Sequence, residues 1–440
     1  MINLVPKTKV LGVGFFYWLK IIWKAGPKMK NLLNDWKYPL LLLSGVGIAN
    51  LGAWIYLIAL NVLVYNMGGS ALAVATLYVI KPLAALLTNA WSGSMIDRLN
   101  KRKLMFHLDI YRAVFIAILP LLPSLWMVYV FVFFISMANA IYEPTAMTYM
   151  TKLIPVEKRQ RFNSLRSLIG SGAFLIGPAI AGVLLIASTP EFAIYINAIA
   201  FLLSGVITLL LPNLDKKSDM HTSNDKLSLA VLKKDWNIVL NFSKKSLYIV
   251  FVYFLFQGMM VLATANDSLE LSFAKEVLLL TDSEYGFLVS AGGAGIILGA
   301  ITNTMLSKKL APSFLIGIGS LFIAIGYLIY AFSNGFVIAA IGFLILSFSM
   351  AYANTGYYTF YQNNVPVHIM GRIGSIYGLV IAGITILITI LFGVATQFIS
   401  IQLVVIVGSL VMLLITIILC VFTLLPSKSK VYHAESVDSK

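Results

Sequence analysis

Long apolar runs dominate the chain, and short polar segments separate them. A helix that crosses a lipid bilayer needs about 20 consecutive apolar residues. The runs are continuous rather than alternating, which argues against a transmembrane β-barrel. The pattern therefore predicts an all-α membrane protein with twelve spans, at roughly 38–64, 70–91, 104–121, 125–150, 165–187, 192–211, 245–266, 284–306, 312–332, 336–361, 371–396 and 400–425.

One long polar gap divides the predicted spans into two sets of six. The expected parts are an N-terminal segment 1–37, a six-helix half 38–211, a linker 212–244, a second six-helix half 245–425 and a tail 426–440. The segment 10–24 is expected to form an interfacial helix, and a further span is the alternative. Residues 225–242 of the linker are amphipathic, so we expect them to lie along the membrane surface.

Composition and charge fix the class and the orientation. The chain is 60% hydrophobic and 11% charged, whereas a soluble domain carries about 25% charged residues. Nearly all of the 32 lysines and arginines fall in loops on one side, and Lys275 stands alone on the other. Because basic loops stay in the cytoplasm, both termini and the linker are expected there, in a multi-pass protein of the cell membrane. The net charge of +15 then reflects loop topology and predicts no nucleic-acid partner.

Several chemistries have no signal in the sequence. There is no G-x-x-x-x-G-K-[ST] motif, so no ATP-driven motor is expected. The four histidines are scattered and Cys420 is the single cysteine. We therefore expect no metal site, no cofactor, no disulfide and no enzymatic activity.

The two halves carry a weak internal repeat. When Gly93 is aligned with Gly299, Asp97 falls on Asn303 and two basic residues follow in both copies. Both copies lie at the end of the second span of their half. Parallel six-span halves joined by a cytoplasmic linker are the layout of major facilitator transporters.

The first copy of this repeat resembles the major facilitator signature between spans two and three. The resemblance implies a latch between the halves in the outward-facing state. The chain departs from the signature at one position, where asparagine replaces glycine, and we expect this residue to adopt a positive φ. For Lys101 and for the nearby Lys103, membrane anchoring by positive charge is the alternative. The matching residues are Gly93, Asp97, Arg98, Asn100, Lys101 and Arg102.

A second resemblance lies in the predicted fifth span. Gly177, Pro178 and Gly182 resemble the Gly-Pro motif of antiporters in this superfamily, although Ala181 replaces one glycine. The resemblance implies export rather than uptake. Ordinary close packing of a glycine-rich helix is the alternative.

The stretches 97–113 and 142–165 are similar to the macrolide-efflux type of drug:proton antiporter. This resemblance implies proton-coupled efflux of small amphipathic drugs by alternating access, in a monomer within the bilayer. The arginine motif of span four in many drug antiporters is absent. Uptake or exchange of a metabolite or lipid, and a non-transporting sensor on the same fold, remain as alternatives.

Ionisable residues inside a span are functional candidates because their burial in lipid is costly. Glu143 lies about 13 Å from the cytoplasmic end of span four at 1.5 Å per residue, and we expect it to be buried and to couple transport to protons. Its alternative role is to pair with Arg112. Asp109 is spaced i, i+3 from Arg112, so these two are expected to pair. Lys81 is expected near the middle of the membrane.

Aromatic and amide side chains supply the remaining candidates for the substrate cavity. Tyrosines of the tenth span can stack on a planar or cationic compound, and helix packing is their alternative role. Asp267 and Glu270 are expected in a solvated loop at the outer end of span seven, with proton entry as the alternative. The candidates for the cavity, besides Lys81, are Asn50, Asn61, Gln257, Tyr357, Tyr358 and Tyr361.

Overall fold

The computed structural model describes residues 27–215, 229–306 and 310–425. Every regular element within these ranges is a helix, and 12 helices are long and apolar enough to cross a membrane. The predicted all-α membrane fold is therefore confirmed. The interfacial helix predicted at 10–24 lies outside the described residues.

The spans form two bundles that are joined through helix α8. The first bundle contains α2 (Pro27–Gly68), α3 (Ala71–Arg98), α4 (Lys101–Ile118), the 3₁₀ turn η1 (Leu119–Leu121), α5 (Leu125–Leu153), α6 (Val156–Ala187) and α7 (Pro190–Leu209). Helix α8 covers Leu229–Lys245. The second bundle contains α9 (Leu247–Glu276), α10 (Asp282–Leu306), α11 (Pro312–Ala331), α12 (Phe336–Asn364), α13 (Val367–Ala395) and α14 (Ile401–Leu424).

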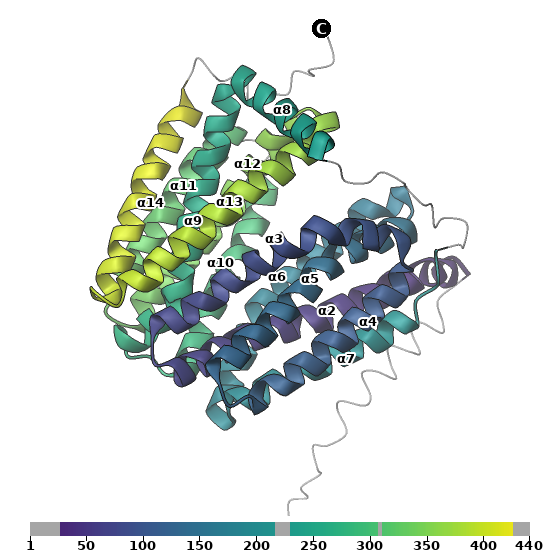
Figure 1. Ribbon diagram of the computed structural model, residues 1–440, viewed down its shortest axis with the longest axis horizontal. Coiled ribbons are helices and arrows are strands. Elements are labelled where there is room, and N and C mark those ends of the chain that lie inside the picture. The colour runs from purple at the N-terminus through teal and green to yellow at the C-terminus, as the bar shows by residue number, and fades with distance from the viewer. Residues whose placement is uncertain (1–26, 216–228, 307–309, 426–440) are drawn as a thin grey trace, which may run out of the picture.

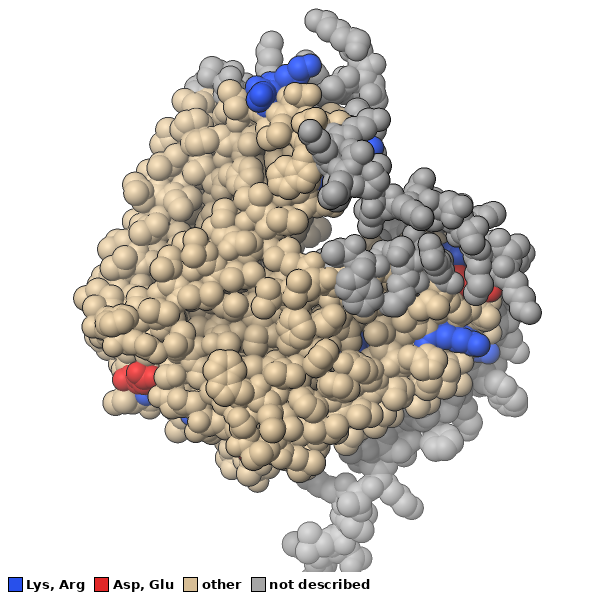
Figure 2. Space-filling model, in the orientation of Figure 1, with Lys and Arg blue, Asp and Glu red and all other residues tan. Residues whose placement is uncertain are grey.

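The two bundles splay apart at one end and meet at the other (Figure 1). We call the end that carries α8 and the turn between α3 and α4 the linker end. The opposite end, where α2 stops at Gly68 and α9 stops at Glu276, is the far end. The space-filling view shows a notch between the two lobes on the side of the linker end (Figure 2). The bundles contact each other mainly through α6 with α10 and through α3 with α9 and α13.

Helix α9 differs most from its predicted span. It continues to Glu276, past the predicted end at 266. The additional turns contain Asp267, Glu270 and Lys275. Their low hydropathy is typical of a loop, which is why the predicted span ended before them. They stay helical because the internal hydrogen bonds of a helix satisfy its backbone and because neighbouring helices enclose the polar side chains.

The amphipathic linker segment forms α8, as its pattern predicts. Val239 is buried and Trp236 is exposed, and the helix packs against α9 and α13. The hydroxyls of Ser243 on α8 and Tyr377 on α13 lie 2.6 Å apart. Helix α8 is therefore attached to the second bundle by a side-chain hydrogen bond as well as by its apolar face.

Candidate functional site

A cavity of about 360 Å³ is present in the first bundle. Its lining residues come from α2, α3, α4, α5, α6 and α7, and those of α5 and α6 include Met150 and Arg166, which lie toward the linker end, so the cavity extends toward that end. Apolar and polar side chains share the wall. The polar and charged ones are Asn50, Tyr56, Lys81, Arg112, Asn139, Tyr142, Glu143, Arg166 and Asn197.

Glu143 projects from α5 onto this wall. Its side chain is exposed, so the expectation of a buried carboxylate is wrong, and the reason is that the cavity admits solvent deep into the span. Within the described residues it makes no hydrogen bond or ion pair, so its alternative role as a partner of Arg112 is not seen. Glu143 is thus an uncompensated carboxylate in contact with the cavity.

Arg112 has other partners. Its guanidinium forms an ion pair with Asp109 and donates a 2.7 Å hydrogen bond to the side-chain carbonyl of Asn139. The guanidinium carbon also lies 4.0 Å from the ring centroid of Tyr142 and 4.2 Å from that of Phe201. The predicted pair of Asp109 and Arg112 is therefore present, and ring stacking holds it in place.

Asp109 is fully buried, at 0% exposure. Besides Arg112, its carboxylate accepts a hydrogen bond of 3.1 Å from the hydroxyl of Ser204 on α7. A buried charge pair is stable only when its remaining lone pairs are satisfied. Through Ser204, the pair joins α4 to α7, and Arg112 of the pair lines the cavity.

Lys81 and Asn50, both candidates for the substrate cavity, line this cavity, and their contact with substrate stays a prediction. The ammonium group of Lys81 lies 5.8 Å from the ring centroid of Tyr78, one turn away on α3. Asn197 was missed by sequence reasoning; it is fully buried, and both of its amide atoms lack a partner among the described residues. Unpartnered buried amides are rare, and this one borders the cavity.

Asn61 is not on the cavity wall, so its prediction as a substrate residue is wrong. It is 1% exposed and lies nearer the far end. Its amide nitrogen points at the hydroxyls of Tyr78 and Tyr285, at 3.5 and 3.4 Å. Tyr285 belongs to the second bundle, so Asn61 occupies the closed contact between the bundles.

Tyr357 also differs from its prediction. It is 4% exposed and stacks on Phe256, with ring centroids 4.2 Å apart. The amide of Gln257 donates a 2.9 Å hydrogen bond to its hydroxyl. Tyr357 and Gln257 therefore bind each other in the second bundle, which supports the helix-packing alternative for this tyrosine.

The two other tyrosines of α12 differ from each other. Tyr361 is half-buried, and its ring centroid lies 6.0 Å from that of Tyr253 on α9. Tyr358 is 59% exposed. Neither borders the cavity of the first bundle, so a contact of these residues with substrate stays a prediction.

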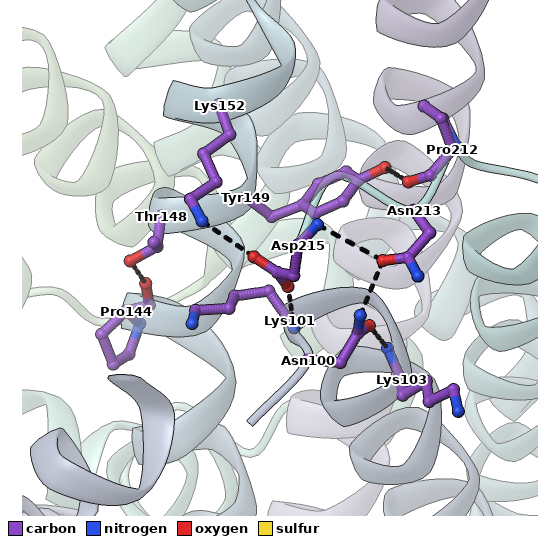
Figure 3. Close-up of polar contacts among 10 residues, drawn as sticks. All are labelled: Asn100, Lys101, Lys103, Pro144, Thr148, Tyr149, Lys152, Pro212, Asn213 and Asp215. Carbon is purple, nitrogen blue, oxygen red and sulfur yellow. Dashed lines mark hydrogen bonds and ion pairs between the residues drawn. The ribbon is translucent and has the colours of Figure 1, made fainter. Parts of the chain in front are cut away.

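The turn between α3 and α4 is built around Asn100. Its φ is −66°, so the expected positive φ is wrong. Its side chain instead caps α4 by accepting a 3.0 Å hydrogen bond from the backbone N–H of Lys103, which is the usual role of asparagine at a helix N-terminus. Its amide nitrogen also donates to Asn213 at 2.6 Å (Figure 3).

Asp215 completes this turn and was missed by sequence reasoning. Its carboxylate accepts hydrogen bonds from the backbone N–H of Lys101 at 2.6 Å and from the side chain of Lys152 at 2.8 Å (Figure 3). Partial burial opposes ionisation of Asp215, but these hydrogen bonds outweigh it and hold the pKa of the carboxyl below its usual range. Asp215 thereby joins the first turn of α4 to the end of α5.

The predicted latch residues are only partly described. The surroundings of Gly93 and the side chains of Asp97 and Arg98 lie outside what the structure describes. Lys101 is buried, and Arg102 donates hydrogen bonds to the carbonyls of Leu209 and Leu211, at 3.4 and 2.8 Å. These contacts of Arg102 and those of Asn100 stay within the first bundle, so a latch between the halves remains a prediction.

The Gly-Pro motif of α6 lies at the contact between the two bundles. A Cβ atom on Gly182 would lie 2.8 Å from the carbonyl oxygen of Ser283 in α10. A Cβ atom on Gly286 would lie 2.7 Å from the carbonyl oxygen of Pro178. Gly177 lies similarly close to Trp54. Glycine therefore permits α6 and α10 to touch backbone to backbone.

Asp267 and Glu270 lie inside the protein rather than in a solvated loop, so that expectation is wrong. Glu270 is 9% exposed, and the carboxylate of Asp267 accepts a 2.6 Å hydrogen bond from the hydroxyl of Tyr327 on α11. The hydroxyl of Tyr285 lies beside the carboxyl group of Glu270. Hydropathy alone could not predict that these two carboxylates are enclosed, because the helices around them come from distant parts of the chain.

The profile of the Major Facilitator Superfamily matches residues 42–389, most of both bundles. The chain belongs to the Major Facilitator Superfamily. A similar curated protein is the uncharacterized MFS-type transporter YfiS of Bacillus subtilis, strain 168, which is 25% identical over 313 residues. The match covers 70% of this chain and 71% of that protein.

Solved structures of other transporters share the fold. The nucleoside transporter NupG superposes with a TM-score of 0.68 at 13% identity, over 88% of this chain and 98% of that one. A bacterial homolog of the human lysosomal transporter Spinster, in an inward-facing and unoccupied conformation, gives 0.64 at 14% identity, over 91% and 99%. A D-xylose-proton symporter gives 0.65 at 12% identity, over 88% and 97%.

Membership of this superfamily identifies the chain as a multi-pass membrane transporter of small substrates rather than an enzyme. It is a secondary transporter, a class whose halves rock about a central site. The cavity lies in the first bundle and extends toward the linker end, where the two bundles splay apart (Figure 1).

Proposed function

We propose that this superfamily member is a proton-coupled exporter of small amphipathic compounds, such as macrolides, that works by alternating access. The basic loops of the linker end support a cytoplasmic location of this end by the positive-inside rule. On that orientation the cavity is open to the cytoplasm and the far end, which faces outward, is closed. An amphipathic compound then enters the cavity from the cytoplasm or from the inner leaflet.

The observation that carries the proposal is the state of Glu143. Its carboxylate is exposed on the cavity wall and has no fixed partner among the described residues. The neighbouring guanidinium of Arg112 is already paired with Asp109. A free carboxylate inside a span can bind a proton or a substrate group, but not both at once. Competition of this kind is what proton-coupled exchange requires.

The direction of transport is supported by the close contact of α6 with α10. Pro178 and Gly182 of the antiporter-like motif form this contact, whereas Gly177 packs against Trp54 of α2. Backbone contact between the bundles closes the far end tightly. A tight outer closure keeps protons from leaking inward while the cavity is open to the cytoplasm.

The wall of the cavity supports an amphipathic cargo. Val46, Ala49, Ala53, Ile116 and Ile135 form apolar parts of the wall, and amides and charges lie among them. Binding sites for small molecules combine a mostly apolar surface with a few polar groups that fix orientation.

A second function, uptake or exchange of a metabolite, is favoured by Lys81. Lys81 and Arg166 on the same wall make no ion pair among the described residues, so they outnumber Glu143 as free charges. A cavity with two free cationic side chains and one free carboxylate favours a substrate that carries an anionic group, such as a carboxylate or a phosphate. Counterflow of labelled compounds in vesicles separates this function from export.

A susceptibility panel tests the export proposal. Cells with and without the protein are exposed to macrolides and other amphipathic drugs, and the panel is repeated with a protonophore. Export predicts a raised inhibitory concentration for at least one compound, which the protonophore abolishes. Unchanged susceptibility to every compound, or resistance that survives the protonophore, contradicts the proposal.

A further inference from the structure

Two carboxylates lie together at the closed far end, away from the cavity of the first bundle. Asp267 and Glu270 are spaced i, i+3 on α9, so they lie on one face of the helix. Tyr327 donates a 2.6 Å hydrogen bond to Asp267, and the hydroxyl of Tyr285 lies beside the Glu270 carboxyl group. We call these four residues the far-end cluster.

No cation neutralises this cluster within the described residues. The nearest lysine along α9, Lys275, forms an ion pair with Asp282 at 2.5 Å and donates to Asn66. The other titratable groups that face the pair are all phenols. They are Tyr78 of α3, Tyr285 of α10, and Tyr327 and Tyr330 of α11. At the rim, Tyr65 of α2 donates to Glu276 at 3.0 Å.

Asn61 supplies an independent sign of a missing ligand. This residue of the first bundle is 1% exposed, and its amide nitrogen points at the hydroxyl of Tyr285 at 3.4 Å. Its carbonyl oxygen has no partner among the described residues. A buried acceptor without a donor is rare, and here it lies against the tyrosine that contacts Glu270.

We propose that Asp267 and Glu270 form a proton-binding site at the far end, and that at least one of them must be protonated for this end to close. The proposal rests on the proton coupling proposed above and adds a second site to it. Two adjacent ionised carboxylates without a cation are costly to bury. When the far end opens, α9 separates from α2 and α3, and water reaches the pair.

The far-end cluster belongs to the second bundle and contacts the first bundle at Asn61, so its charge acts on the contact between the bundles. Asn61 and Tyr78 belong to the first bundle, whereas Asp267, Glu270 and Tyr285 belong to the second. Protons from the outside therefore bind while the far end is open, neutralise the pair and permit closure. Tyr78 lies one turn from Lys81 on α3, so the cluster adjoins the cavity through two side chains of one helix.

The test measures closure directly, with the proton as the ligand. Spin labels are attached at Leu121→Cys in the first bundle and Phe398→Cys in the second, in a Cys420→Ala background. Both positions are exposed at the far end, at 71% and 82%. Pulsed electron spin resonance then gives the distance across the far end in lipid nanodiscs between pH 5 and pH 9.

The proposal predicts that the closed distance gains population as the pH falls. A closure linked to one proton changes its equilibrium constant by up to about tenfold per pH unit. In the double variant Asp267→Asn, Glu270→Gln the closed population becomes independent of pH, because amides mimic the protonated acids. The control Glu284→Gln, an exposed carboxylate at the same end, keeps the wild-type response.

A pH response that persists in the double variant overturns the proposal, and so does a response to sodium ions at fixed pH. If the double variant does not fold, Tyr327→Phe takes its place. Loss of that hydroxyl removes a hydrogen bond that stabilises ionised Asp267, so closure shifts to higher pH; an unmoved midpoint contradicts the proposal. Because no substrate is present, a failure here is distinct from a failure of drug export, which the susceptibility panel reports.

Discussion

Gly182 of α6 and Gly286 of α10 face each other across the boundary between the two bundles. A Cβ atom on Gly286 would lie 2.8 Å from the Cα of Gly182 and 2.7 Å from the carbonyl oxygen of Pro178. Real Cβ atoms do not approach backbone so closely, so the two bundles must separate if either glycine gains a side chain. The closed far end depends on this contact.

We predict that Gly286→Ala shifts the protein toward the conformation that is open at the far end. Overpacking a close contact costs about 1–3 kcal/mol, which changes the closed-to-open ratio by about thirtyfold at the middle of that range. The distance between labels at Leu121 and Phe398 measures the shift. Gly170→Ala is the matched control, since a Cβ there meets nothing within 4 Å. Equal distances in both variants would refute the role of this contact.

Removal of one partner from the pair of Asp109 and Arg112 is expected to destabilise the first bundle strongly. Asp109→Asn leaves the guanidinium buried without a counter-charge, which costs about 3–5 kcal/mol. Thermal unfolding in detergent measures the loss. Lys103→Ala removes an exposed charge about two turns before Asp109 on α4 and is expected to unfold like the wild type. A small loss in Asp109→Asn would show that the pair is dispensable for folding.

Asp215→Asn is expected to lower the unfolding temperature at neutral pH. The pKa of Asp215 is lower in the folded protein than its usual value. Its ionised form therefore contributes stability above about pH 3.9, the value for a free aspartate, and this contribution is lost as the pH falls through the folded-state pKa. The difference between variant and wild type should shrink in acid. A difference that is constant with pH would assign the effect to packing.

Lys81→Gln discriminates between the two candidate cargoes. If the cavity holds an anionic group, loss of this ammonium weakens transport of anionic compounds about tenfold or more, in line with a charged hydrogen bond of about 1.5–3 kcal/mol. If the cargo is a neutral or cationic amphipathic drug, its export is unchanged or rises. Vesicle uptake of labelled compounds of each charge measures the effect, and Lys103→Gln serves as the control on the protein surface.

Features that depend on nearby residues in the sequence could be predicted. The twelve spans follow from the length of their apolar runs, and the pair of Asp109 and Arg112 follows from the i, i+3 spacing on one helix. The sequence also singled out Lys81, Asn50 and Glu143, because a polar group inside a span is costly, and all three line the cavity. It predicted a buried Glu143, however, whereas this side chain is exposed.

Features that depend on contacts between distant helices could not be predicted. Asn61 has an ordinary position in an apolar run, and only the meeting of α2 with α10 shows that it contacts Tyr285. The same holds for Asp267 and Glu270, which look like loop residues until α11 encloses them. Asn100 was misread because its capping role depends on a hydrogen bond, whereas a resemblance to a signature glycine indicated only its backbone angle.

Substrate-driven proton movement in vesicles tests the central claim most directly. The protein is reconstituted with a pH-sensitive dye, and a compound identified by the susceptibility panel is added. The wild type and the control Glu284→Gln should move protons against the compound, and Glu143→Gln should lose this movement while it still binds the compound. Proton movement at the wild-type rate in Glu143→Gln would contradict the assignment of Glu143 as the coupling carboxylate.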